Sequence, residues 1–226
     1  AGHASISWLL EYANPLIKVT IVPRGRALGA AWYLPEERQI TTKEQMLDEM
    51  CATLGGRAAE DLFLNRISTG AMNDLERVTK QAYGMIAYLG MSDKLPNLCY
   101  YNNEEYSFNR PYSEKTAELI DTEVKNMVNE QYERAKKILS EHREGHNQLA
   151  QLLIDKEVIF AEDVERIFGK RPWASRSEEI MAAKESQEAA EAEKRLAEEV
   201  KEKEKEIKEE EAENSTEEKE ATEAKI

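Results

Sequence analysis

Apolar residues recur every three or four positions along much of the chain, and this spacing predicts amphipathic helices. A first helix runs from Ala1 to about Leu10, and two short helices are expected around residues 149–153 and over Ala161–Phe168. We predict a break at Gly145, before the first of these short helices. Three longer stripes mark the main helices: Leu47, Met50, Cys51, Leu54, Ala58 and Leu62; Leu75, Val78, Ala82, Met85, Ile86 and Leu89; and Ala117, Ile120, Val124, Met127, Val128, Ala135, Ile138 and Leu139.

A short β element is predicted between the first two helices. Residues 17–21 alternate between apolar and polar types, and residues 28–34 form a second extended run after a turn at residues 23–26. This pair is either a small hairpin that caps a helical core or an edge strand that pairs with an extended peptide through its backbone. Residues 91–112 show no sustained period and are expected to form a long loop. The fold class is therefore mainly α with a small β-hairpin or sheet.

Two consecutive glycines, Gly55 and Gly56, interrupt the stripe of the second helix. Each glycine in a helix interior costs about 1 kcal/mol relative to alanine. We infer that another segment packs closer to this backbone than a side chain would allow.

Charge is distributed unevenly, and this divides the chain. Residues 181–226 hold 17 glutamates and nine lysines and arginines, a net charge of −8. This is more than half of the net charge of −14 of the whole chain. We expect a domain over residues 1–173 and an acidic Glu/Lys/Ala-rich tail over residues 174–226, which is either disordered or a solvated helix. An acidic chain is a poor partner for nucleic acid, whose phosphates need clustered lysine and arginine.

The remaining composition limits where the protein works. No uninterrupted apolar stretch approaches the ~20 residues of a membrane-spanning helix, so the chain itself is expected to be soluble. Cys51 and Cys99 have no metal-type spacing, and a reducing compartment is the simpler interpretation. The chain starts without Met and without a signal peptide, as an excerpt of a longer protein would.

Candidate metal ligands are few. His3 lies one turn before Ile6 on the first helix, where it is either a hydrogen-bonded core residue or a ligand. Asp74 lies in the first turn of a later helix, where it either complements the helix N-terminus or binds metal. A second pair, His142 and His146, has a His-x-Glu-x-His order that matches neither zinc-protease pattern, and we interpret it as a decoy.

Four short motifs together resemble one protein family. They are Ala-Gly-His-Ala at residues 1–4, Leu-Gly at 28–29, Gly-Gly-Arg-Ala-Ala-Glu at 55–60 and Ser-Thr-Gly-Ala-Met-Asn-Asp-Leu at 68–75. In this order they resemble the peptidase domain of the FtsH family, the ATP-dependent, membrane-anchored zinc metalloproteases of peptidase family M41. The resemblance extends to about Trp173 and implies a helical metalloprotease domain.

The resemblance also implies the site. The family carries His-Glu-Ala-Gly-His on its first helix, so His3 would be the second histidine ligand and Asp74 the third protein ligand of one Zn²⁺ per subunit. The first histidine and the general-base glutamate would precede Ala1, so no catalytic residue is expected in this chain. Glu60 is either an exposed carboxylate or a residue that orients a ligand. Substrate is expected along an edge strand at Leu28, Gly29, Ala30 and Ala31.

The expected protein is the C-terminal peptidase domain of an enzyme that degrades membrane and soluble proteins by attack of a zinc-activated water. The resemblance implies a homo-hexamer or a hetero-hexamer with paralogues. It also implies an inner-membrane anchor, a peptidase domain on the cytoplasmic or mitochondrial matrix side, and ATP bound only by an upstream module. No Gly-x-x-x-x-Gly-Lys-Ser/Thr loop is present here. The alternative is a non-catalytic helical oligomerisation module, because the first His and the Glu are absent from this chain.

Overall fold

The structure is a computed structural model that describes residues 1–23, 25, 28–34, 40–100 and 111–173, together with residues 183, 184 and 186. The chain divides into two units, Ala1–Trp173 and Ala174–Ile226. The expectations for most of the acidic tail and for residues 101–110 of the loop over residues 91–112 fall outside the described residues, while the described part of this loop, residues 91–100 and 111–112, contains no helix and no strand. No described helix is both long enough and apolar enough to cross a bilayer.

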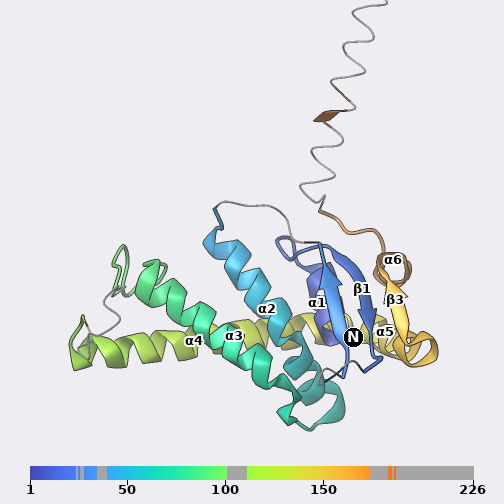
Figure 1. Ribbon diagram of the computed structural model, residues 1–226, viewed down its shortest axis with the longest axis horizontal. Coiled ribbons are helices and arrows are strands. Elements are labelled where there is room, and N and C mark those ends of the chain that lie inside the picture. Colours follow the sequence, from blue (N-terminus) through green and yellow to red (C-terminus); the bar gives the residue numbers. More distant parts are fainter. Residues whose placement is uncertain are drawn as a thin grey trace, which may run out of the picture. The chain divides into compact units, whose positions relative to one another are not determined.

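Helices dominate the first unit, as predicted. They are α1 (Gly2–Leu9), α2 (Lys43–Ala59), α3 (Met72–Tyr83), α4 (Glu114–Glu141), α5 (Arg143–Lys156) and α6 (Ala161–Phe168). Single π-helical turns, η1 (Glu60–Leu64) and η3 (Gly84–Tyr88), extend α2 and α3, and the 3₁₀ turn η2 (Thr69–Ala71) leads into α3. Figure 1 shows α2 and α3 packed along the long helix α4, with α1 and the sheet beside α2.

Side-chain caps mark the starts of α2 and α4. Thr42 accepts from the backbone N–H of Gln45, and the Gln45 side chain accepts from the N–H of Thr42, which forms a capping box at the start of α2. The hydroxyl of Ser113 accepts from the N–H of Thr116 at the start of α4.

The β element is an antiparallel sheet of three strands, β1 (Leu16–Thr20), β2 (Ala30–Tyr33) and β3 (Val158–Phe160), in the order β2-β1-β3. The pairing of β1 with β2 confirms the predicted hairpin. The strand β3 was not predicted, because three residues are too few to show an alternating pattern. It pairs with the free edge of β1 and leaves β2 as an edge strand.

The predicted helix break at Gly145 is wrong. The break lies at His142, between α4 and α5, and Gly145 is inside α5. A Cβ atom at residue 145 would lie 2.6 Å from the ring of Phe168. The glycine is therefore needed for the packing of α6 against α5 and does not end a helix.

Helix α1 separates two hydrophobic clusters and is buried on both sides. Ala4 and Trp8 pack with the sheet, α5 and α6, while Ile6 and Leu10 pack with α2 and α4. Cys51 of α2 is fully buried in the second cluster, as its place on the apolar stripe predicts.

The crossing of α1 and α2 explains the paired glycines. A Cβ atom at Gly55 would lie 2.9 Å from the carbonyl oxygen of Gly2, and a Cβ atom at Gly2 would lie 2.3 Å from the carbonyl oxygen of Gly55. These neighbours are backbone atoms, which cannot rotate away as the end of a side chain can. The predicted close approach is confirmed, and it is an approach between two helix backbones.

Gly55→Ala is expected to destabilise the chain, because the added methyl group would force the two helix backbones apart. Overpacking of this kind costs about 1–3 kcal/mol, measurable by denaturant unfolding. Gly84→Ala is the matched control, since its nearest neighbour would be a Tyr88 ring atom at 4.0 Å. It should leave stability unchanged or raise it. Equal stability of the two variants would contradict the packing role assigned to Gly55.

Candidate metal centre

His3 has one ring nitrogen bound to the fold and one turned toward α3. Its Nδ1 lies 3.1 Å from the backbone carbonyl oxygen of Ala52 in α2. A carbonyl oxygen only accepts, so Nδ1 carries the proton and donates. In the neutral ring, Nε2 therefore presents a lone pair, which is the form in which histidine binds a metal.

Gly56 provides the space for this ring. A Cβ atom at residue 56 would lie 2.4 Å from His3 Nε2 and 2.9 Å from its Cε1. The second glycine of the pair thus has a different purpose from the first, since Gly55 accommodates the α1 backbone and Gly56 accommodates the imidazole.

Asp74 approaches His3 from the opposite side. It lies in the first turn of α3, where a carboxylate also complements the helix N-terminus. Its Oδ2 is 3.5 Å from His3 Nε2, and both side chains are about one-third exposed. The two candidate ligands, which are far apart in the sequence, are thus brought together.

The distance of 3.5 Å between Nε2 and Oδ2 fits two ligands of one ion. A direct hydrogen bond between a charged imidazolium and a carboxylate would be about 2.7–2.9 Å long. Ligands about 2.0–2.2 Å from a tetrahedral Zn²⁺ lie about 3.4 Å from each other. Two protein ligands are one short of the usual three in a catalytic site. The described residues contain no group of three or more His, Cys, Asp or Glu side chains that could hold a metal ion.

Glu60 is bound to the segment that leads into α3. Its carboxylate accepts from the backbone N–H and the hydroxyl of Ser68, and the hydroxyl bond lowers the pKa of Glu60. Ser68 in turn accepts from the N–H of Gly70 in η2. Any effect of Glu60 on Asp74 in this arrangement is transmitted by the backbone of residues 68–74.

The edge strand β2 lies near the same site. The pKa of Tyr33 in β2 is raised to about 12, chiefly by burial and also by the charge of Asp74. A hydrogen bond with Ser7 opposes part of this shift. The charge of Asp74 therefore acts on the phenol of Tyr33 in this strand.

Backbone directions in β2 alternate, so only some groups face the open edge. The N–H of Leu34 donates to the carbonyl of Pro15 on the β1 side. By alternation, Ala30 and Trp32 also direct their N–H and C=O groups at β1, while Ala31 and Tyr33 direct theirs outward.

Of the predicted substrate-binding residues, two precede the strand. Leu28 is 81% exposed. A Cβ atom at Gly29 would lie 2.7 Å from the carbonyl oxygen of Thr20 in β1. The small size of Gly29 is therefore required inside the chain, whether or not a substrate also approaches it.

The second histidine pair has a structural environment. Nδ1 of His142 donates to the carbonyl of Ile138 at the end of α4. His146 is buried, and its ring stacks on Phe63 at a centroid distance of 4.0 Å. Burial lowers the pKa of His146 to about 4. Both side chains thus have structural partners, and the interpretation that this pair binds no metal stays a prediction.

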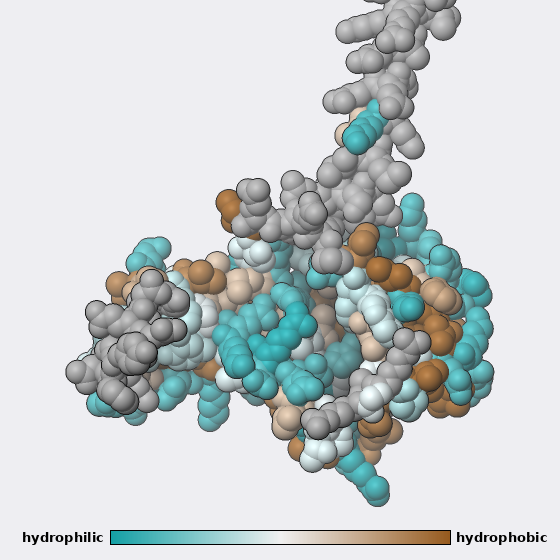
Figure 2. Space-filling view, in the orientation of Figure 1, coloured by the Kyte–Doolittle hydropathy of each residue, from teal (hydrophilic) through white to brown (hydrophobic). Residues whose placement is uncertain are grey.

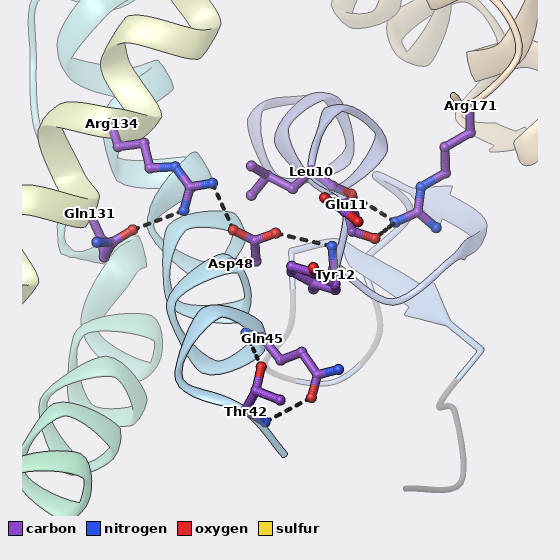
Figure 3. A network of polar contacts seen from close by, with 9 residues as sticks. All are labelled: Leu10, Glu11, Tyr12, Thr42, Gln45, Asp48, Gln131, Arg134 and Arg171. Atoms are coloured by element: carbon purple, nitrogen blue, oxygen red, sulfur yellow. Dashed lines mark hydrogen bonds and ion pairs between the residues drawn. The ribbon is translucent and has the colours of Figure 1, made fainter. Parts of the chain in front are cut away.

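Sequence reasoning missed a set of residues that hold the turn after α1 (Figure 3). Asp48 of α2 is buried and accepts from the N–H of Tyr12 at 3.0 Å and from Arg134 of α4 at 2.7 Å. The signal was an acidic residue between Leu47 and Met50 on an apolar stripe. Hydrophilic side chains gather over α3 in the view of Figure 2. Glu76 and Lys80 of this helix form an exposed ion pair.

A histidine and an aspartate from two helices thus approach each other as two ligands of one metal ion would. The family model "Peptidase family M41" matches residues 1–167, and the chain belongs to this family. The resemblance to FtsH proteases is thereby confirmed.

Relatives from bacteria, plants and animals agree with this assignment. "ATP-dependent zinc metalloprotease FtsH" of Parabacteroides distasonis is 72% identical over 187 residues, which are 82% of this chain and 27% of the relative. "ATP-dependent zinc metalloprotease FTSH 10, mitochondrial" of Arabidopsis thaliana is 49% identical over 77% of the chain and 22% of the relative. The mouse "Mitochondrial inner membrane m-AAA protease component AFG3L2" is 44% identical over 78% and 22%. The chain thus spans about a quarter of the length of these relatives.

The buried His146 predicts a pH dependence of stability. Its pKa is about 4 in the fold against 6.5 in the unfolded chain, so its contribution is fully present above pH 6.5 and is lost as the pH falls toward 4. We expect His146→Phe, which keeps the stack on Phe63, to remove on the order of 1–2 kcal/mol of this acid sensitivity, after allowance for solvent screening. Denaturant unfolding of both proteins between pH 4 and 7 measures the difference. Parallel pH profiles would contradict it.

Proposed function

We propose that this chain is the peptidase domain of an ATP-dependent zinc metalloendopeptidase that cleaves membrane and soluble proteins. The observation that carries the proposal is the 3.5 Å approach of His3 Nε2 to Asp74 Oδ2, with the histidine tautomer fixed by Ala52. Membership of peptidase family M41 supports it.

In the proposed site, His3 and Asp74 are two of the three protein ligands of one Zn²⁺. The third is a histidine four residues before His3, followed by a glutamate that takes the proton of the attacking water. Both would lie on α1 extended toward its N-terminus, which places the two histidines on one helix face. When bound, the zinc would polarise the scissile carbonyl and lower the pKa of its water to about 7.

Substrate binding is assigned to the open edge of β2. The outward N–H and C=O groups of Ala31 and Tyr33 can pair with an extended peptide whatever its side chains are. This suits an enzyme that must accept many sequences. Leu28 and Gly29 lead into the strand, which Ala30 begins, and Leu28 is exposed.

The proposed assembly follows the relatives. The mouse relative is named as a component of an inner-membrane m-AAA protease, and several others as ATP-dependent. We assign to this protein a homo- or hetero-hexamer, an inner-membrane anchor and an ATPase module outside these 226 residues, with the peptidase domain on the cytoplasmic or matrix side.

Metal content tests the ligand assignment. In a protein with His-Glu and a few helical residues in front of Ala1, we expect one zinc per subunit by mass spectrometry. Asp74→Ala should lose this zinc, because it leaves the site one ligand short. The double variant His142→Ala/His146→Ala should keep it. If zinc is retained in Asp74→Ala but lost when His142 and His146 are replaced, the site lies at those two histidines and the assignment to His3 and Asp74 is wrong.

The same comparison separates the two candidate functions. The 226-residue chain alone should not cleave casein, since positioned acid–base groups contribute roughly 10²–10⁴-fold in rate. The extended hexameric enzyme should cleave it. An oligomerisation module would instead assemble without zinc and without cleavage in either form.

Proline substitutions test the edge strand. Ala31→Pro removes an outward N–H, worth about 0.5–1.5 kcal/mol, and should raise KM of the full-length enzyme about 2- to 10-fold with zinc unchanged. Ala30→Pro is the matched control, because its N–H faces β1. It should lower the melting temperature instead. A KM unaffected by Ala31→Pro would leave the hairpin as a structural cap.

A further inference from the structure

The carbonyl groups of the turn that follows α1 are bound by an arginine from the far end of the folded unit. Helix α1 ends at Leu9 without a basic residue in its last turn, and its C-cap Leu10 is already extended, so the carbonyls that follow lie outside the helix and need donors from elsewhere. Nη2 of Arg171 lies 2.8 Å from the carbonyl oxygen of Leu10, 3.0 Å from that of Glu11 and 2.6 Å from that of Ala13. Figure 3 shows this guanidinium pointing at the end of the helix.

The position of this cation has an electrostatic effect as well. The C-terminus of a helix carries a partial negative charge, which a guanidinium complements. The segment around Arg171 makes a second contact with α1, in which Nε1 of Trp8 donates to the carbonyl of Gly169 at 3.0 Å. Gly169 is therefore bound to the last turn of α1, and Arg171 to the turn that follows it.

The turn after α1 is held from the other side by an anion. Asp48 accepts from the N–H of Tyr12, while Ser7 donates to the carbonyl of Asn14. Arg171 thus binds three carbonyls of this turn, Ser7 binds a fourth, and Asp48 binds one backbone amide. This restricts movement of α1 along its own axis.

His3 is on the same rigid helix, about 10 Å from Leu10 at 1.5 Å per residue. Sites of this kind tolerate displacements of only about 0.5 Å. A shift of α1 would carry Nε2 away from Asp74. The imidazole could not rotate to compensate, because it has little room beside Gly56.

We propose that Arg171 is a positioning residue for the metal centre: through its bonds to the end of α1 it fixes the distance between His3 and Asp74. This inference rests on the proposed function, since it concerns zinc held by those two residues. Loss of an outer contact that orients a ligand typically weakens metal binding about 10- to 100-fold.

The test uses the full-length, zinc-loaded enzyme. Arg171→Met should weaken zinc binding about 10- to 100-fold in a chelator competition and should change the visible absorption spectrum of the Co²⁺-substituted protein. Arg171→Lys should restore much of the affinity, because all three acceptors are served by one nitrogen and an ammonium has three N–H donors.

Two control variants separate positioning from general stability. Arg166 is a second cation in the same part of the chain; its side chain is 73% exposed and pairs with Asp163. The zinc affinity of Arg166→Met should therefore stay within about twofold of wild type. Ile120→Ala creates a cavity in a different cluster. It should lower the melting temperature without altering the zinc affinity or the cobalt spectrum of the folded protein.

An unchanged zinc affinity and cobalt spectrum in Arg171→Met would overturn the inference, and so would an equal loss of zinc in Ile120→Ala at matched melting temperature. In either case, zinc that wild type binds and Asp74→Ala loses would leave the proposed function intact. A wild-type enzyme without zinc would instead overturn the proposed function and this inference with it.

Discussion

The contact between the backbones of α1 and α2 is the constraint on which the rest of the structure depends. Gly2 and Gly55 let the two helices approach until a carbonyl oxygen of each lies only 2.3 or 2.9 Å from where a Cβ atom of the other would be. At this separation the ring of His3 fits over Gly56 and its Nδ1 reaches the carbonyl of Ala52. Helix–helix packing therefore determines the histidine tautomer, and the tautomer determines which nitrogen can bind a metal.

Helix α1 transmits constraints from several elements to this nitrogen. Its two faces are buried in separate hydrophobic clusters, and the turn that follows it is bound by groups from α2 and from residue 171. Asp74 is placed independently, by a 3₁₀ turn that Ser68 caps and Glu60 holds. The candidate centre thus forms where two separately supported elements meet, which is how enzymes hold ligands within a fraction of an ångström.

Periodicity was enough to predict most of the fold. The stripes of α2, α3 and α4 and the hairpin are local features of sequence, and each is present. The strand β3 could not be predicted, because it exists only through its pairing with β1. The helix break predicted at Gly145 was wrong for a related reason. This glycine makes room for the ring of Phe168, which is distant in the sequence, and no local pattern reveals that contact.

The candidate site was predictable from motifs but its support was not. Spacing alone left His3 and Asp74 each with a structural alternative, and only the family motifs connected them. The paired glycines did signal close packing, although not that one of them faces a ring and the other a backbone. Arg171 gave no signal, since an arginine that binds three carbonyls of another segment resembles any surface cation in the sequence.

The most direct test of the account is an anomalous diffraction measurement at the zinc edge on crystals of the full-length enzyme. The account predicts one strong anomalous peak per subunit, about 2.0–2.2 Å from both His3 Nε2 and an Asp74 carboxylate oxygen. His3 Nδ1 should remain bonded to the carbonyl of Ala52. A peak at His142 or His146, or a zinc bound by His3 through Nδ1, would contradict the account.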